Sequence, residues 1–98
     1  MSFAVKTITY QQNLMLNICD ADLVGRSITK EDFSLNISKS YFADRFVEQS
    51  EAEELLKKYS IINLVGKEII SLSINLGIGS SKGVKEIESI PFLLVFKF

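Results

Sequence analysis

The C-terminal segment constrains the fold of this chain most. Residues Pro91 to Phe98 read Pro-Phe-Leu-Leu-Val-Phe-Lys-Phe, and they are apolar on both faces of any strand until Lys97. An exposed strand with high β-propensity and low charge pairs readily with other chains, so this one must be covered. We expect it inside a sheet, flanked by strands and a helix; the alternative is pairing across a two-fold axis or with a partner protein.

The length and composition favour a single domain. A chain of 98 residues is too short for two ordinary domains, and its apolar share of 47% and charged share of 23% suit one globular core spanning residues 1–98. The N-terminus lacks the charged head and continuous apolar run of a secretion signal, and no apolar run approaches the roughly 20 residues that span a bilayer. These features predict a cytoplasmic protein without a membrane partner.

Period-two patterns predict strands in the first half of the chain. Residues 3–10 are rich in β-branched and aromatic types, residues 14–19 alternate, and the polar residues 11–13 separate them. We therefore expect an antiparallel hairpin with one face on the core. Residues 33–37 also alternate and predict a half-buried strand, and residues 44–48 predict a weaker, short one.

Two helices follow from the pattern of the second half. Ser50 and Glu53 have the spacing of a capping box, and the apolar residues from Ala52 to Tyr59 recur at i, i+3, i+4 and i+7. A second helix is predicted over residues 62–76, with Gly77 as its C-terminal stop. Gly66 falls on the apolar face of that helix, where close backbone packing would explain a glycine.

The remaining segments complete an α+β prediction. Residues 77–83 are expected to form a loop, and residues 84–90 and 92–98 to be extended on either side of Pro91. We predict a mainly antiparallel sheet with the two principal helices packed on it.

Composition excludes several kinds of active site. The chain has no histidine, which removes the Ser-His-Asp triad, the Cys-His pair and every histidine-containing metal site. The single cysteine, Cys19, lies in an alternating apolar stretch and is expected to act as a small buried hydrophobe. The sequence Gly77-Ile78-Gly79 with Lys82-Gly83 matches neither phosphate-loop spacing, so a plain loop is favoured. No catalytic residue, metal ligand or cofactor is predicted.

Two polar clusters are the candidate functional residues. Asp20 and Asp22 precede Arg26, and paired carboxylates can hold Mg²⁺ or do acid/base work. Capping of a single helical turn that Gly25 ends would explain the same residues, as would a solvated charge cluster. Asn63 and Lys67 could likewise contact a ligand, or they could serve the start of a helix and the surface.

Three segments in this order resemble the archaeal family called domain of unknown function four-two-four. They are residues 19–26, the helix at 51–59, and residues 61–67 with their continuation to Gly77. The resemblance implies a cytoplasmic α+β protein with no established activity or cofactor. Family members tend to be encoded near translation genes, which suggests ribosome-linked work. The family's usual Gly-Val-Pro-His stretch is replaced here by Ser89-Ile90-Pro91-Phe92, so a role for that histidine cannot apply.

Two functional hypotheses result. The favoured one is a non-catalytic interaction module that docks on a protein or ribonucleoprotein, as a monomer or homodimer. The alternative is a small ligand-binding protein or enzyme, whose site would be formed by the segments that most resemble the family: Asp20, Asp22, Gly25, Arg26, Asn63, Gly66 and Lys67. The formal charge of −1 argues against strong direct binding of nucleic acid, although aromatic residues from Phe3 to Phe46 could stack bases.

Overall fold

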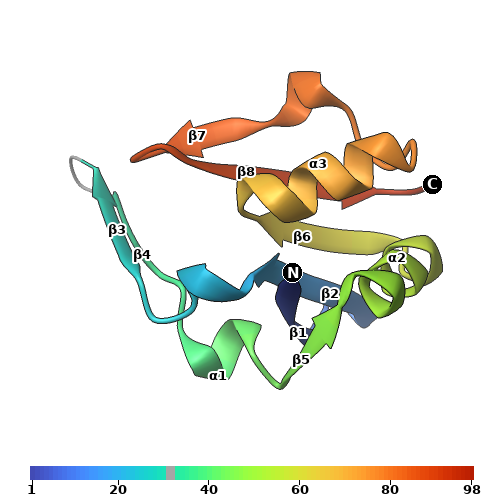
Figure 1. The fold of residues 1–98 in the computed structure, drawn as a ribbon, viewed down its shortest axis with the longest axis horizontal. Coiled ribbons are helices and arrows are strands. Elements are labelled where there is room, and N and C mark those ends of the chain that lie inside the picture. The colour runs from blue at the N-terminus through green and yellow to red at the C-terminus, as the bar shows by residue number, and fades with distance from the viewer. Residues whose placement is uncertain (31–32) are drawn as a thin grey trace.

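One mixed sheet organises the computed structural model, which describes residues 1–30 and 33–98. Its strand order is β5-β1-β2-β6-β8-β7, and every neighbouring pair is antiparallel except β2 with β6. A separate β3–β4 hairpin projects from one end of the sheet (Figure 1). The elements are β1 Ser2–Tyr10, β2 Asn13–Asp20, η1 Ala21–Leu23, β3 Ser27–Lys30, β4 Phe33–Asn36, α1 Lys39–Phe42, β5 Arg45–Glu48, α2 Gln49–Lys58, β6 Ile61–Val65, α3 Lys67–Asn75, η2 Ser81–Gly83, β7 Lys85–Ile87 and β8 Ile90–Phe96.

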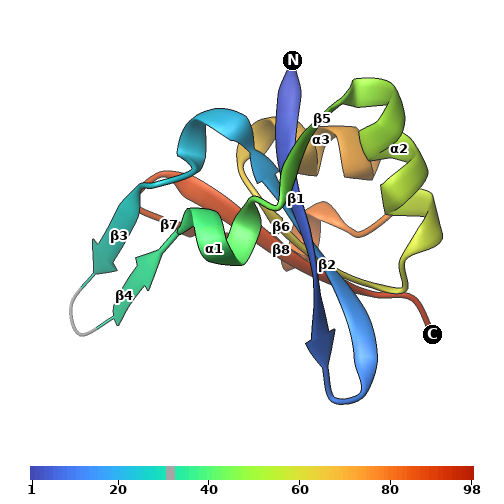
Figure 2. The same cartoon turned by 90° about the horizontal axis from the view of Figure 1, so that it is seen from below.

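The fold is the predicted α+β domain with a mainly antiparallel sheet. Helices α2 and α3 lie together on one side of the sheet, which we call the helix-covered face (Figure 2). The side chains that fill the space between them and the sheet are almost fully buried and come from strands and helices alike; they include Leu16, Ile18, Leu56, Ile62, Leu64 and Ile69. This face holds the larger core.

A smaller core lies on the opposite side, at one end of the sheet. Ala4, Cys19 and Val65 pack there beneath η1 and α1, which contribute Leu23 and Phe42. The rest of that side presents Ile8, Asn63, Leu94 and Phe96, with Lys6 at its border against α1, while Met15, Asn17 and Ile61 on it are almost fully buried. We call this region the open face.

The predicted antiparallel N-terminal hairpin is confirmed. β1 and β2 pair from Phe3 opposite Asp20 to Tyr10 opposite Asn13. The two turn residues, Gln11 and Gln12, have φ values of 48° and 68°, which is the backbone that a two-residue hairpin turn needs. Neither is a glycine, so this turn conformation is strained.

The first of the two predicted helices is present, but its predicted start is wrong. α2 confirms the helix and its buried face, with Ala52 and Leu56 fully buried and Leu55 and Tyr59 partly so. The capping box is wrong, because α2 begins at Gln49 after the N-cap Glu48, and no side chain caps it. Ser50 therefore lies inside the first turn instead of ahead of it.

The predicted helix over 62–76 is wrong in its first part. Residues Ile61–Val65 form β6, a central strand buried on both faces, and α3 begins only at Lys67. A short continuous apolar run fits a buried strand as well as a buried helix, so periodicity could not separate them. The end of the helix was predicted correctly, since α3 stops at Asn75 and Gly77 follows with φ 78°.

β8 lies between β6 and β7 in the strand order, as predicted, but within the described residues β7 flanks only its first half. β8 pairs with β6 from Phe92 to Phe96 and with β7 from Ile90 to Phe92. The break between β7 and β8 falls at Glu88 and Ser89, which form a second two-residue turn with positive φ, and Pro91 lies within β8 instead of separating two strands. The Lys97 ammonium donates a hydrogen bond of 2.5 Å to the Leu56 carbonyl, which joins the end of this segment to α2.

Other expectations were met in part. The strand at 44–48 is β5, and the single turn after Asp20 is η1. β4 occupies most of the strand predicted at 33–37, but the expected burial of Phe33 and Leu35 lies outside what the structure describes. Among residues 1–30 and 33–98, no helix is long and apolar enough to cross a membrane.

Candidate functional site

Asp20 ends β2 and caps a helix that is distant in sequence. Its Oδ2 accepts a hydrogen bond of 3.0 Å from the Glu68 amide, and its Oδ1 accepts one of 2.8 Å from the Ile69 amide. These amides belong to the first turn of α3, which has no capping side chain of its own. Capping of the single turn after Asp20 was one explanation for Asp20 and Asp22, but this turn, η1, has no side-chain cap. The parallel pairing of β2 with β6 explains the difference, because it ends both strands beside the start of α3.

Gly66 joins β6 to α3 and lies against this carboxylate. Its φ is 114°, and a Cβ atom there would come within 2.5 Å of the Cγ and Oδ2 of Asp20. Its amide donates to the Pro91 carbonyl at 2.9 Å. Close packing was the predicted reason for this glycine and is confirmed, although the position is a strand-to-helix junction and not a helix face.

Burial governs the ionisation of this region. It raises the pKa of the Asp20 carboxyl, and the two amides that donate to the carboxylate oppose that rise. Burial, with the nearby charges of Asp20 and Asp22, raises the pKa of the Cys19 thiol to about 12. Cys19 is fully buried and stays a neutral thiol near pH 7, so the interpretation as a buried hydrophobe is confirmed.

Of the other candidate residues, Asp22 and Gly66 lie near Asp20, whereas Arg26, Asn63 and Lys67 do not line the cleft beside it. Asp22, Gly25, Arg26 and Lys67 are exposed, and Asn63 lies half-buried on the open face, opposite Asn17 in β2 and Leu94 in β8. Asp20 projects on the helix-covered face, so the sheet separates it from Asn63.

A cleft of about 280 Å³ adjoins Asp20. It is lined by Met1, Ser2, Phe3, Asp20, Ala21, Asp22 and Glu68, so it contains neither Arg26 nor Asn63 nor Lys67. In the part of the chain that the structure describes, no group of three or more histidine, cysteine or carboxylate side chains is placed to hold a metal ion. The arrangement gives the shared site of the alternative hypothesis no support.

The open face carries apolar side chains that sequence reasoning did not single out. Leu94 is 52% exposed and Phe96 47%, whereas their neighbours Leu93 and Val95 are buried. The Phe96 and Phe98 rings stack with centroids 5.9 Å apart. The signal was present in the sequence, because a strand that is apolar at every position must place alternate residues on each face. What the sequence did not reveal is that the helices cover only one of these faces.

The remaining aromatic residues give little support to base stacking. Phe3 and Phe42 are buried in the two cores, and Phe46 is 53% exposed on β5. The side chains of Tyr10 and Tyr41 lie outside what the structure describes. Lys6 on the open face donates a hydrogen bond to the Ser40 carbonyl and so is held by α1.

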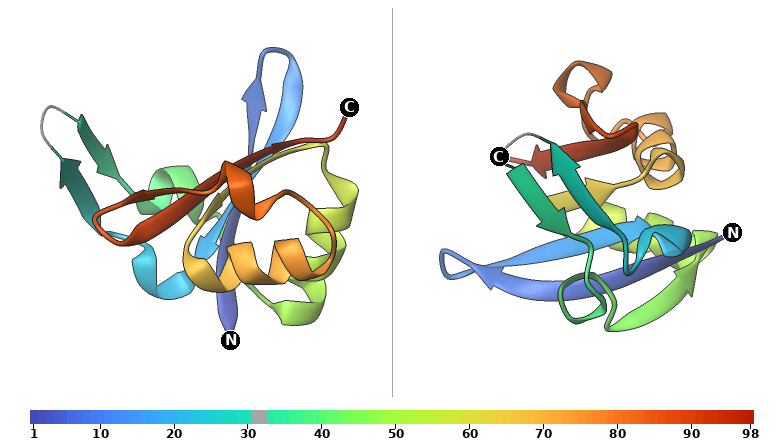
Figure 3. Two further views of the ribbon diagram at one scale, coloured as in Figure 1. Left: turned by 90° about the horizontal axis from the view of Figure 1, so that it is seen from above. Right: turned by 90° about the vertical axis from the view of Figure 1, so that its left-hand side faces the viewer.

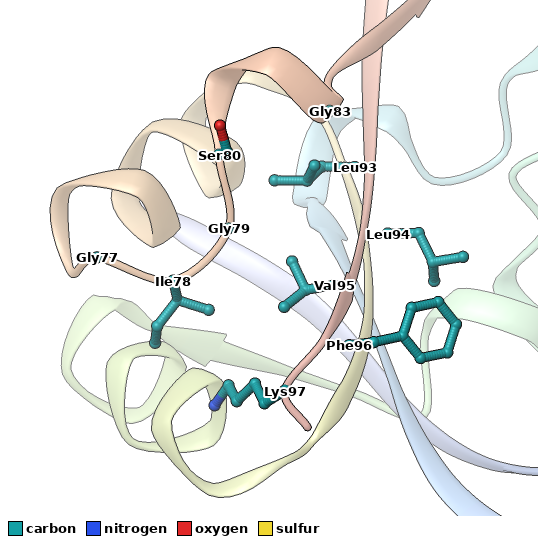
Figure 4. Close-up of a pocket in the computed structure, with 10 residues that line it drawn as sticks. All are labelled: Gly77, Ile78, Gly79, Ser80, Gly83, Leu93, Leu94, Val95, Phe96 and Lys97. Atoms are coloured by element: carbon teal, nitrogen blue, oxygen red, sulfur yellow. The ribbon is translucent and has the colours of Figure 1, made fainter.

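The glycine-rich segment 77–83 is a plain loop, as predicted, ending in the short turn η2. It passes beside β8, and the two enclose a cleft of about 360 Å³ (Figure 4). Leu93 and Val95 point toward the loop, while Leu94 and Phe96 point to the other side. A Cβ at Gly79 would come within 2.9 Å of Leu93, so the loop already packs against these side chains.

The fold and its surfaces define a small α+β domain whose sheet is covered on one face and partly open on the other. The chain belongs to the family described as Protein of unknown function (DUF424), whose model matches residues 8–98. It is also similar to the crystal structure of an uncharacterized conserved protein from Methanopyrus kandleri, with a TM-score of 0.79 and 17% identity over 100% of this chain and 95% of that one. A search of curated proteins found no match. At this identity the structural likeness shows the fold.

Proposed function

We propose that the protein is a non-catalytic interaction module that docks on a protein partner through the open face. The observation that carries the proposal is the exposure of Leu94 and Phe96 on a long strand that is paired to the sheet. Apolar and aromatic side chains that contribute nothing to the core are typical of binding surfaces, where such residues supply most of the affinity. The family resemblance favours a ribonucleoprotein such as the ribosome as the setting.

The charge of the open face suits a partner with a neutral or acidic surface. β1, β2, β6 and β8 lie wholly in the described part of the chain, and their one carboxylate, Asp20, projects on the helix-covered face. Lys6 adds a positive charge to the open face. One held lysine is too little for tight binding to bare RNA, since such binding grows with the number of phosphates neutralised.

Polar residues that an enzyme would have used already have structural roles. Asp20 caps α3 and Gly66 makes room for its carboxylate, while Asn63 lies beyond the sheet. This use of the residues supports an interaction module over a ligand-binding site.

Co-purification at native expression tests the proposal. Tagged protein should move with a larger assembly in a density gradient and capture defined proteins, and the double variant Leu94→Ser/Phe96→Ser should lose them. Phe46→Ser is the matched control, because Phe46 is equally exposed at the opposite edge of the sheet. Migration of the wild type alone, or equal capture by the double variant, would remove the proposal. Capture of protein-free RNA in place of protein would also contradict it.

A further inference from the structure

β8 has two halves with different surroundings. Ile90 and Pro91 pair with β7, and Phe92 pairs with both β6 and β7. β7 begins at Lys85, opposite Phe92, and runs to Ile87. Within the described residues, no strand pairs with Leu94 or Phe96 on the side away from β6, so the second half of β8 is an edge of the sheet. Viewed from above, β8 crosses in front of β1 and β2, and the chain end lies on the side away from β7 (Figure 3, left).

The backbone groups at this edge can be assigned from the register. The Gly66 amide donates to the Pro91 carbonyl, and the Lys97 amide donates to the Ser60 carbonyl. Hydrogen-bonded pairs alternate along antiparallel strands, so the odd-numbered residues of β8 face β6. Leu94 and Phe96 therefore direct both their N–H and C=O groups outward, where another strand can bind them.

This edge lacks the protection found at the other edges of the sheet. β5 is short and carries Arg45 and Glu48, and β7 is three residues long and carries Lys85 and Glu86. Charges and short length discourage strand addition. The run from Phe92 to Phe96 has no charge, and the cleft of about 360 Å³ between β8 and the loop leaves room beside it.

We propose that a second copy of this chain pairs with this edge, β8 against β8, antiparallel about a two-fold axis at Phe96. In this register Phe96 lies opposite the partner's Phe96, and Leu94 lies opposite the partner's Phe98. The two sheets become one continuous sheet, and the pairing of Phe92 with Lys85 is left intact.

Self-complementarity favours a second copy over an unrelated strand. The outward backbone groups of Phe96 meet those of the partner's Phe96, and the apolar side chains of Leu94, Phe96 and Phe98 meet the same set. The dimer goes beyond the proposed docking function, because it would present two open faces side by side.

Disulfide trapping tests the register. Phe96→Cys places two thiols opposite each other on the axis, at about the 5.5 Å Cα separation of a hydrogen-bonded pair, which a disulfide can span. Mild oxidation should yield a covalent dimer quickly. Leu94→Cys and Phe46→Cys are the controls, because Leu94 lies roughly 14 Å from its equivalent in this register. The native Cys19 is buried and does not compete.

Analytical sedimentation tests association without a covalent cross-link. As the protein concentration rises, the apparent mass of the full chain should increase from 11.0 kDa to twice that value. Phe96→Lys should weaken association about fivefold or more, because like charges then face each other across the axis. A mass of 11.0 kDa at every concentration up to about 1 mM would overturn the proposal. Equal trapping of Phe96→Cys and Leu94→Cys would also overturn it, by indicating contact between faces. Neither result depends on co-purification, so each proposal can fail alone.

Discussion

The two faces of the sheet are made by the same strands, yet they are used differently. On β8, Leu93 and Val95 are 4% and 7% exposed against the helices, while Leu94 and Phe96 are 52% and 47% exposed on the open face. Burial of an apolar side chain contributes about 1.5 to 3 kcal/mol, so the helix-covered face holds most of the stability. The apolar residues of the open face add little to folding and are available for binding.

The largest effect is expected beneath α2. Leu56→Ala should lower the free energy of unfolding by about 2 to 5 kcal/mol, because Leu56 is fully buried in the main core and its removal leaves a cavity. Urea melts measure this. A loss below about 1 kcal/mol would contradict the assignment of the covered face as the stabilising one.

The next effect concerns the junction between β6 and α3. Gly66→Ala should lower the free energy of unfolding by about 2 to 4 kcal/mol. The new Cβ would collide with Asp20, and the alanine would have to adopt an unfavourable positive φ. Gly25→Ala is the matched control, because Gly25 also has a positive φ, of 95°, but has nothing within 4 Å of its Cβ position. It should cost only about 1 to 2 kcal/mol. Equal losses in thermal melts would show that the contact with Asp20 has no energetic weight.

Asp20→Asn should cost about 1 to 2 kcal/mol, since an amide oxygen can replace only one of the two acceptors at α3. The folded-state pKa of Asp20 is raised, so the native state binds its proton more tightly than the unfolded state does. The stability that Asp20 contributes through this shift is therefore complete below the unfolded-state pKa. It is lost as pH rises through the folded-state pKa. The stability difference between wild type and Asp20→Asn should shrink over that range. A difference that grows with pH would contradict the direction of the shift.

The smallest effect is expected on the open face. Leu94→Ala should change the free energy of unfolding by no more than about 0.5 kcal/mol, because the side chain is half exposed. Leu93→Ala, one residue away and buried, should cost about 2 to 5 kcal/mol. Similar costs for the two variants, in parallel urea melts, would remove the distinction between the faces.

Local patterns in the sequence predicted much of this fold. The N-terminal hairpin and the α2 helix carry clear periodicities of two and 3.6 residues, and both were found. The place of β8 between β6 and β7 followed from its apolar character, whereas the free edge of its second half did not. Ile61–Val65 was missed because a strand buried on both faces loses its alternation, which is the pattern that distinguishes strands.

The candidate site was harder to predict because its contacts are long-range. Asp20 bonds to amides 48 and 49 residues away, and no local motif encodes that partner. Spacing explained Asp20 as a local cap, which is the commoner use of such a residue. The exposure of Leu94 and Phe96 depends on which face the helices cover, which only the tertiary arrangement decides.

The parallel pairing of β2 with β6 also bears on how fast the chain folds. β1–β2 and β7–β8 are hairpins that close over two residues, whereas β2 and β6 join positions such as Met15 and Ile61. Closing so long a loop costs chain entropy before any contact is gained, and folding rates fall as contacts become less local. Formation of the β2–β6 pair is therefore expected to limit the folding rate. The cap of Asp20 on α3 is expected to form after this step. It would then stabilise the native state and slow unfolding without changing the folding rate.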